Sequence, residues 1–170
     1  MKDKIIYDGW LKLYERKING RRYEIIKNYD AVAAIIMNER QEILLVKQFR
    51  PAYMDYTLEI PAGCLDVDGE DNETCLIREL KEETGLIVPK EKIYKIISYR
   101  PIMGFSNSVL HLYKAQINTE EIEKLELNDN DVIEVHWMPL DEFERKIEAE
   151  EIMDSKTVMS YLYLKKETFL

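Results

Sequence analysis

The chain has 170 residues, of which 46% are hydrophobic and 34% charged, a balance typical of one globular domain rather than of a disordered segment. Its formal net charge of −9 argues against binding of long DNA or RNA through a broad basic surface, because such binding depends on Lys and Arg. The acidic balance does not exclude a small phosphorylated substrate, since metal ions can bridge acidic side chains and phosphate.

The cysteines and the hydropathy of the chain favour a cytoplasmic protein. Cys64 and Cys75 match no common zinc-binding spacing and are too few for a disulfide framework, so we expect thiols in a reducing compartment. The first residues lack the apolar core of a signal peptide, and no apolar run approaches the length that spans a membrane. We therefore expect a cytoplasmic location.

The first part of the chain is expected to be mostly β-structure. Short strand-like runs occur at 10–14 and 22–26, with a turn at Asn19-Gly20 between them. These runs lie within residues 5–29 and predict a small β-rich extension.

The next segment predicts the central strands of a sheet. The run at 31–36 is short and almost wholly apolar, which favours a buried strand. A turn at 38–41 leads into a second strand at 42–49, and a third strand at 56–60 stops at Pro61. A loop rich in Gly and Asp follows.

A helix is expected after this loop. Asp71 or Asn72 is its candidate N-cap, and the helix is expected to run to Thr84 with Gly85 as its C-terminal stop. Its apolar side is supplied by Cys75, Leu76, Leu80 and Ile77.

The same helix carries a concentration of acids. Glu79, Glu82 and Glu83 fall at positions i, i+3 and i+4, which share one face of a helix. Their like charges repel each other, and a divalent cation that prefers oxygen ligands would convert this repulsion into coordination. Lys81 and Arg78 are expected to point elsewhere on the helix, although Arg78 could fold back to orient a carboxylate. The alternative is a solvated acidic helix without a ligand.

Strands and helices close the chain. Strands are expected at 93–99, 109–115 and 132–138, and helices at 140–152 and 155–166. No repeat, low-complexity tract or linker interrupts this order, so the sequence predicts one α/β domain.

The stretch around the acidic helix resembles the signature of the Nudix hydrolases, which is Gly, five residues, Glu, seven residues, then Arg-Glu-apolar-any-Glu-Glu-any-Gly-apolar. Here Glu70 is followed by seven residues and then by Arg78-Glu79-Leu80-Lys81-Glu82-Glu83-Thr84-Gly85-Leu86. Six residues rather than five separate Gly63 from Glu70, which we interpret as a one-residue insertion in the loop. The resemblance implies that Glu70 pairs with Arg78.

The resemblance also implies a metal site and its chemistry. Glu79 and Glu83 are then expected to coordinate Mg²⁺ or Mn²⁺, and the backbone carbonyl of Ala62 to complete the shell. Glu82 would help directly or through water, and Glu82 and Glu83 are the candidate catalytic residues of the helix. Bound cations would neutralise a diphosphate and activate a water molecule for hydrolysis.

Two runs outside the helix resemble the ADP-ribose pyrophosphatase branch of this family. Residues 46–51 match its Gln-aromatic-Arg pattern, and residues 58–63 match its Glu-apolar-Pro-Ala-Gly pattern. Arg50 is then the candidate clamp on the substrate diphosphate, a role suited to a fork of donors. The alternative for Arg50 is a surface arginine at the end of a strand.

Two loops also match this branch. The run that begins at Gly104 and contains Ser106 resembles a loop that lines the substrate pocket, although Met103 stands where the branch has proline. A later acidic loop makes Asp129 a candidate general base and Asp131 a possible metal ligand, in positions where the family has Glu. The alternative for these aspartates is a polar turn before a strand.

The resemblance finally implies a fold and an assembly. We expect a Nudix-type α/β/α sandwich with a mixed sheet over residues 30–170, preceded by a mostly β extension over 1–29 that forms the interface of a homodimer. Trp10 in this extension is a candidate platform for adenine, and the alternative is a tryptophan of the core or interface.

The expected function is metal-dependent hydrolysis of a nucleoside diphosphate sugar, most specifically of ADP-ribose to AMP and ribose 5-phosphate. The alternatives are a Nudix hydrolase of another nucleotide sugar or of a damaged nucleotide, and an ADP-ribose-binding module without turnover.

Overall fold

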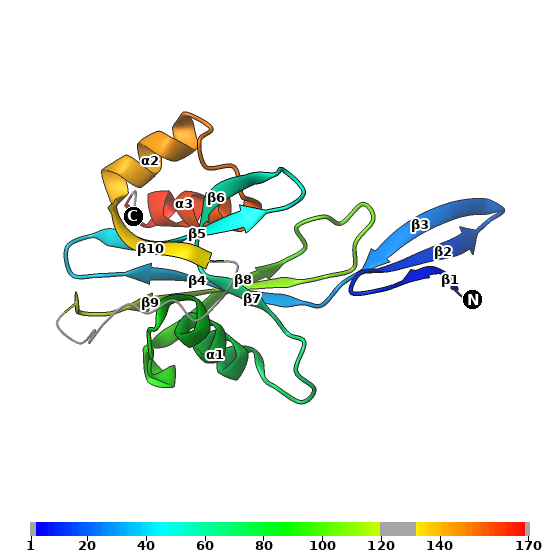
Figure 1. Cartoon of the computed structure of the whole chain (residues 1–170), viewed down its shortest axis with the longest axis horizontal. Helices are drawn as coiled ribbons and strands as arrows, with labels where there is room; N and C mark the ends of the chain where they lie inside the picture. Colours follow the sequence, from blue (N-terminus) through cyan, green and yellow to red (C-terminus); the bar gives the residue numbers. More distant parts are fainter. Residues whose placement is uncertain (1–2, 120–131, 169–170) are drawn as a thin grey trace.

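The computed structural model describes residues 3–119 and 132–168, in which two sheets and three helices are formed (Figure 1). The helices are α1 (Asn72–Thr84), α2 (Leu140–Glu148) and α3 (Ser155–Thr168), and a single 3₁₀ turn, η1, spans Lys90–Lys92. The strands are β1 (Lys4–Asp8), β2 (Lys12–Ile18), β3 (Arg21–Lys27), β4 (Ala31–Met37), β5 (Glu42–Arg50), β6 (Asp55–Glu59), β7 (Ala62–Cys64), β8 (Ile93–Tyr99), β9 (Leu110–Gln116) and β10 (Val132–Pro139).

The larger sheet is mixed and has seven strands within the described residues. Its main order is β10-β5-β4-β9-β8, with β6 paired to β5 and β7 paired to β4. The β4–β9 pair is parallel, whereas the other pairs are antiparallel. The expected mixed sheet is therefore confirmed.

Helices cover both faces of this larger sheet, with α1 on one side and α2 and α3 on the other (Figure 1). Alternate residues of β4 point to opposite faces, as they do in any strand. One set joins the core under α1, namely Val32, Ala34 and Ile36. The other joins the core under α2 and α3, namely Ala33, Ile35 and Met37. The unbroken apolar run is thus explained by burial on both faces, and the expected α/β/α sandwich is confirmed.

The smaller sheet consists of β1, β2 and β3 in antiparallel order and projects from one end of the larger sheet (Figure 1). Asn19 and Gly20 have φ angles of 50° and 79°, in the left-handed region. The predicted turn is therefore confirmed as a tight two-residue hairpin turn. None of the residues in β1–β3 is buried.

Several details differ from the sequence prediction. The strand expected at 10–14 begins at Lys12 and runs to Ile18, because residues 9–11 form a bend. The helix expected at 140–152 ends at Glu148, because the chain turns at Glu150, whose φ is 59°. The apolar pattern continues beyond that end because Ile152 is buried in the same core as Phe143. The short strand β7 was expected to be part of a loop, and a run of three residues that contains glycine carries little strand signal.

Candidate active site at the acidic helix

The acidic helix α1 begins and ends where its sequence predicts. The side chain of Asp71 accepts hydrogen bonds from the N–H groups of Glu73 and Thr74, both at 3.0 Å, so Asp71 is the N-cap. Gly85 adopts a φ of 76° and its N–H donates to the carbonyl of Lys81 at 3.0 Å. The two caps fix where the helix begins and ends. Its apolar face packs against β4.

The three carboxylates of this helix differ in their exposure to solvent. Glu83 is 3% exposed, the Glu79 side chain is 13% exposed, and the Glu82 side chain is 48% exposed. Burial raises the pKa of Glu79, although its ion pair with Arg78 opposes this effect. A half-buried carboxylate next to another acid is a group whose charge a cation would stabilise.

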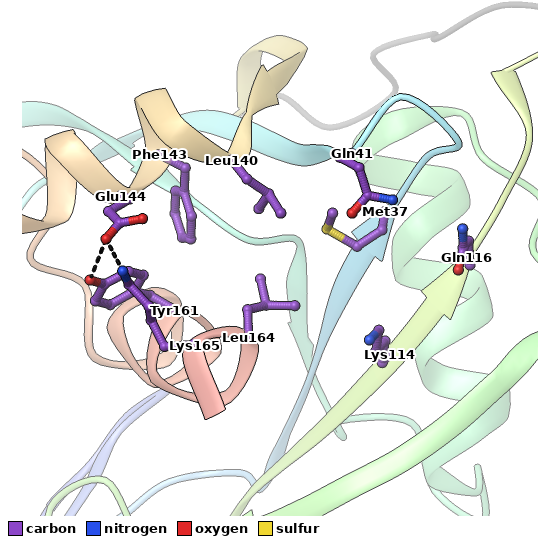
Figure 2. Close-up of a pocket in the computed structure, with 10 residues that line it drawn as sticks. All are labelled: Met37, Gln41, Lys114, Gln116, Leu140, Phe143, Glu144, Tyr161, Leu164 and Lys165. Carbon is purple, nitrogen blue, oxygen red and sulfur yellow. Dashed lines mark hydrogen bonds and ion pairs between the residues drawn. The ribbon is translucent and has the colours of Figure 1, made fainter. Parts of the chain in front are cut away.

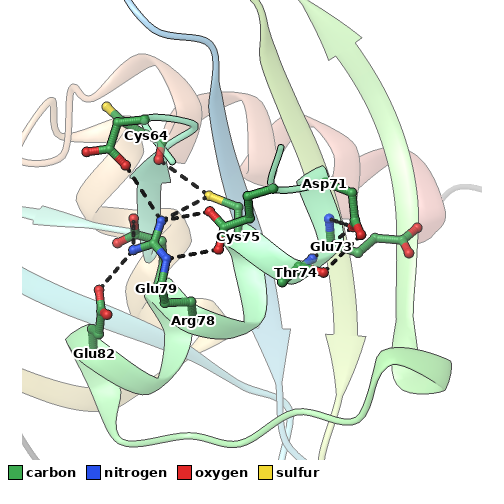
Figure 3. Close-up of polar contacts among 10 residues, drawn as sticks. Cys64, Asp71, Glu73, Thr74, Cys75, Arg78, Glu79 and Glu82 are labelled. Carbon is green, nitrogen blue, oxygen red and sulfur yellow. Dashed lines mark hydrogen bonds and ion pairs between the residues drawn. The ribbon is translucent and has the colours of Figure 1, made fainter. Parts of the chain in front are cut away.

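Arg78 pairs with four acidic side chains, and Figure 3 shows its contacts with Glu79 and Glu82. Its guanidinium donates two hydrogen bonds to Glu70, both at 3.1 Å, and its Nη1 donates to Glu79 at 2.8 Å and to Glu82 at 3.0 Å. A weaker ion pair at 3.7 Å reaches Asp66. These bonds to Arg78 lower the pKa of Glu70. The expected pairing of Glu70 with Arg78 is confirmed.

Of the two directions considered for Arg78, the structure shows the one in which its side chain folds back onto the carboxylates of the acidic face. A guanidinium on a long side chain can reach residues on either side of its own helical position, and Glu82 lies one turn further along α1. Arg78 thus relieves part of the repulsion between Glu79 and Glu82. The loop residue Glu70 fixes the guanidinium from the other side.

Strand β7, which contacts α1, presents its backbone to the carboxylates of the helix. The hydrogen bonds from Ala34 N to Pro61 O and from Leu65 N to Asp30 O show which residues of this segment bond to β4. Bonding directions alternate along an antiparallel strand, so the backbone groups of Ala62 point away from β4. The N–H of Ala62 donates to Oε2 of Glu83 at 3.0 Å. The Ala62 carbonyl therefore points to the side on which Glu83 lies.

Gly63 makes room for one of the candidate metal ligands. A Cβ atom at this position would lie 1.9 Å from Cδ and 2.1 Å from Cγ of Glu79, distances that no real contact allows. The absence of a side chain lets Glu79 lie directly against the backbone of β7. A side chain at position 63 would therefore displace the Glu79 carboxylate from the backbone of β7.

The donor set suits a hard divalent cation. Carboxylates and a backbone carbonyl are the ligands that Mg²⁺ and Mn²⁺ prefer, and Glu79, Glu83 and Ala62 bring such groups to the contact between α1 and β7. Within residues 3–119 and 132–168, no three His, Cys, Asp or Glu side chains are arranged as a metal site. The Nη1 atom of Arg78 lies between Glu79 and Glu82, which keeps these two carboxylates on the guanidinium.

Arg50 ends β5 and is held by a buried carboxylate on the neighbouring strand. Its Nε and Nη2 donate to the two oxygens of Glu59 at 2.6 and 2.5 Å. Glu59 also accepts from Thr57 at 2.5 Å and from the ammonium of Lys156. Burial opposes ionisation of Glu59, but these donors outweigh it and lower its pKa to about 2. The pKa of Arg50 is raised, first by Glu59 and to a smaller extent by Glu83, so Arg50 lies within electrostatic range of the acidic helix.

The predicted substrate loop is joined to the smaller sheet. The N–H of Ile26 in β3 donates to the carbonyl of Phe105 at 2.8 Å, and Ile26 forms an isolated bridge with Ser106. The Ser106 and Ser108 hydroxyls are 3.0 Å apart. A Cβ on Gly104 would meet nothing within 4 Å, so local sterics do not demand glycine at this position.

Trp10, Asp129 and Asp131 are the remaining residues that the sequence singled out. Trp10 is 65% exposed in the connection between β1 and β2. Asp129 and Asp131 lie outside the described residues.

Sequence reasoning missed the group that surrounds Arg50. Glu59 stood within a matched pattern but without a role, and Lys156 and Thr157 carried no signal, because they lie 97 residues along the chain from their partners. A buried lysine can be recognised only when its neighbours are known.

A separate pocket lies on the other face of the larger sheet, between α2, α3 and strands β4 and β9 (Figure 2). It has a volume of about 250 Å³, and Phe143, Leu140 and Leu164 form much of its apolar wall. Glu144 accepts from the ammonium of Lys165 and pairs with Tyr161 at its rim. This pocket contains none of the residues that surround α1.

None of the helices in the described part of the chain is long and apolar enough to cross a membrane.

Comparison with known proteins identifies relatives over most of the chain. The family model described as NUDIX domain matches residues 27–159. A Bacillus subtilis protein named ADP-ribose pyrophosphatase is 33% identical over 96% of this chain and 89% of its own length. The methanol dehydrogenase activator of Bacillus methanolicus is 33% identical over 89% of this chain and 82% of its own. The ADP-ribose pyrophosphatase of Mycobacterium tuberculosis is 30% identical over 82% of this chain and 66% of its own.

Proposed function

The chain belongs to the Nudix family, and we propose that it hydrolyses the diphosphate bond of ADP-ribose, with a bound divalent cation, to AMP and ribose 5-phosphate. Relatives named ADP-ribose pyrophosphatase support this choice of substrate. The observation that carries the proposal is the fit of α1 against β7. Glu83 accepts from Ala62 N–H, and Gly63 leaves space for Glu79, so that acidic oxygens converge on one backbone segment.

The proposed metal ligands are Glu79, Glu82, Glu83 and the carbonyl of Ala62, and the proposed cation is Mg²⁺ or Mn²⁺. When bound, such ions neutralise diphosphate oxygens, lower the pKa of a bound water and stabilise the departing phosphate. Glu82 and Glu83 are also the proposed catalytic residues of α1. Arg78, held by Glu70, keeps Glu79 and Glu82 within reach of one another.

Arg50 is the proposed clamp for the diphosphate. Glu59 engages its Nε and Nη2 atoms, so the Nη1 edge is directed away from that carboxylate. Because the Arg50 side chain is 41% exposed, this edge can donate to an anionic substrate. The proposed roles of Gly104 and Ser106 are to line the pocket, and that of Trp10 is to stack on the base. Asp129 as general base and Asp131 as a metal ligand belong to the same proposal.

We also propose that the protein is a cytoplasmic homodimer. The support is the apolar surface of β1–β3, on which Ile5, Ile6 and Tyr7 are exposed. A three-stranded sheet that leaves such residues in water gains stability when a second copy covers them.

Hydrolysis is tested by incubating the protein with ADP-ribose and Mg²⁺ and measuring AMP by chromatography. We expect AMP and ribose 5-phosphate in equal amounts, and no product when the cation is chelated. Glu83→Gln keeps an acceptor for Ala62 N–H, so we expect a folded variant with activity reduced about a hundredfold or more.

The matched control is Glu73→Gln, which removes a carboxylate from the first turn of the same helix, where Glu73 pairs with Lys90 at 2.8 Å. This variant should retain wild-type activity. Tight binding of ADP-ribose without cleavage in the presence of Mg²⁺ or Mn²⁺ would show a binding module instead. Cleavage of another nucleotide sugar in preference to ADP-ribose would change the substrate assignment alone.

A further inference from the structure

A line of alternating charges connects α3 with the end of β5. Arg50 Nη2 donates to Glu59 Oε2 at 2.5 Å, the ammonium of Lys156 donates to the same oxygen, and that ammonium lies 3.1 Å from Asp154. The side chains in the middle are buried, with Glu59 3% and Lys156 9% exposed. The line therefore runs from the interior to a guanidinium that reaches solvent.

The position of Lys156 is unfavourable for a residue that serves stability alone. It lies in the first turn of α3, where the partial positive charge of a helix N-terminus disfavours a cation. Burial of a lysine also costs hydration and side-chain entropy. An apolar side chain in place of a buried ion is often neutral or stabilising when its partner is replaced as well. The geometry of Lys156 thus points to a task beyond packing.

The start of α3 also holds the end of β6 and the segment that follows it, which leads to the proposed backbone ligand Ala62. Lys156 binds Glu59, and the adjacent Thr157 accepts a hydrogen bond from the N–H of Ile60 at 3.0 Å. Two neighbouring residues of α3 therefore fix two neighbouring residues at the end of β6. Ile60 is separated from Ala62 by a single proline, so this anchor lies directly before the proposed backbone ligand.

The second cation changes what Arg50 offers to an anion. A carboxylate with one arginine would neutralise that arginine and weaken its attraction for a phosphate. Glu59 is shared with Lys156, whose ammonium also pairs with Asp154 at 3.1 Å, so two cations balance two carboxylates. Without Lys156, the negative charges of Glu59 and Asp154 would be balanced by Arg50 alone. At the same time Glu59 restrains the guanidinium through two bonds, which reduces the entropy that Arg50 would lose on binding.

We propose that Lys156 is a positioning residue that acts through Glu59. It keeps the Arg50 guanidinium in place, and it balances carboxylate charge that would otherwise weaken the attraction of Arg50 for the substrate diphosphate. This inference rests on the proposed role of Arg50 in substrate binding. Lys156 itself does not touch the substrate.

The test compares Lys156→Met with Lys156→Arg in the full chain. The dissociation constant is measured by calorimetry for an ADP-ribose analogue with a methylene bridge in place of the cleaved oxygen, and kcat and KM are measured with ADP-ribose. For Lys156→Met we expect the dissociation constant and KM to rise about tenfold, because the contact of Arg50 with the diphosphate is weakened, with kcat within about twofold of wild type. Lys156→Arg should recover part of the affinity.

Lys165→Met is the matched control, because Lys165 is also on α3 and also pairs with a carboxylate, Glu144, far from Glu59. It should bind the analogue as wild type does. A purely structural role for Lys156 predicts instead a lower unfolding temperature with unchanged affinity, which would overturn the proposal.

A double-mutant cycle with Glu59→Gln asks whether Lys156 acts through Glu59. Glu59→Gln alone should also raise the dissociation constant, and addition of Lys156→Met should raise it no further. Independent, additive losses would contradict the proposed route. The double variant removes both buried charges together, so it also serves if Lys156→Met alone does not fold.

The same assays separate this inference from the proposed function. If the wild type fails to hydrolyse ADP-ribose, the substrate assignment is wrong, and the comparison is repeated with the nucleotide sugar that it does hydrolyse. If the wild type is active and Arg50→Ala binds weakly while Lys156→Met binds normally, the role of Lys156 alone is wrong.

Discussion

The two sheets of this molecule differ in what covers them. In the larger sheet every residue of β4 after Ala31 is buried, because α1 packs on one face and α2 and α3 on the other. In β1–β3 no residue is buried, and the large apolar side chains Ile5, Ile6 and Tyr7 are exposed. Free energy from apolar burial is therefore concentrated in the larger sheet, while the smaller sheet has apolar surface to offer a partner.

The difference extends to the roles proposed for each sheet. The acidic helix, Ala62 and Arg50 belong to the layers of the larger sheet, where side chains are held by buried neighbours. The substrate loop instead bonds to the smaller sheet through Ile26 and Phe105. The proposed function thus assigns the reaction chemistry to the part of the molecule with a buried core, and the remaining substrate contacts to a loop joined to the part without one.

The largest effect is expected from removing a side chain of the core between the larger sheet and α2. Phe143 is 1% exposed and packs edge to face with Tyr161 at a centroid distance of 6.3 Å. Phe143→Ala should lower the free energy of unfolding by about 3–5 kcal/mol, measured by urea denaturation. Tyr7→Ala in the smaller sheet should change it by less than about 0.5 kcal/mol when both proteins are measured as monomers. Equal losses would show that the smaller sheet shares the core.

An intermediate effect is expected from acid, again within the larger sheet. The pKa of Glu59 is lowered from its usual 4.5 to about 2 in the folded protein. Its contribution to the free energy of unfolding is therefore fully present above about pH 4.5 and is lost as the pH falls toward about 2. The loss should be on the order of 1–3 kcal/mol, measured by thermal unfolding between these values.

Glu59→Gln should flatten this acid-induced decrease. Asp3, directly before β1, also has a lowered pKa, because of its hydrogen bonds to Arg16, but its side chain is less buried, at 17% exposed against 3% for Glu59. Asp3→Asn should leave the pH profile of the wild type almost unchanged. A profile that responds to Asp3 and not to Glu59 would reverse the assignment.

The smallest effect on folding is expected when a charged side chain replaces an exposed apolar one on the smaller sheet. Such a substitution should instead change the assembly of the protein. Ile6→Lys should shift the protein from dimer to monomer in size-exclusion chromatography with light scattering, because a buried lysine at an interface is costly. Ile87→Lys is the control, since Ile87 is an exposed isoleucine that follows α1. A monomeric wild type, or a dimeric Ile6→Lys variant, would refute the proposed interface.

Local features of the site were predictable because their partners are close in sequence. The caps of α1 at Asp71 and Gly85, and the pairing of Glu70 with Arg78, involve residues within a few turns of each other. The side-chain direction of Arg78 was left open by the sequence, since the reach of a flexible guanidinium depends on which acids the loop brings near it. The roles of Glu59 and Lys156 were not predictable at all.

The sequence by itself determined the acidic helix, its limits, the spacing of Glu79, Glu82 and Glu83, and the family that this pattern indicates. These features depend on helical periodicity and on capping, which act over a few residues. The tertiary structure alone decided that Gly63 must accommodate Glu79 and that α3 supplies Lys156 to the carboxylate beside Arg50. Such contacts join segments far apart in the chain, so only packing of the whole fold selects them.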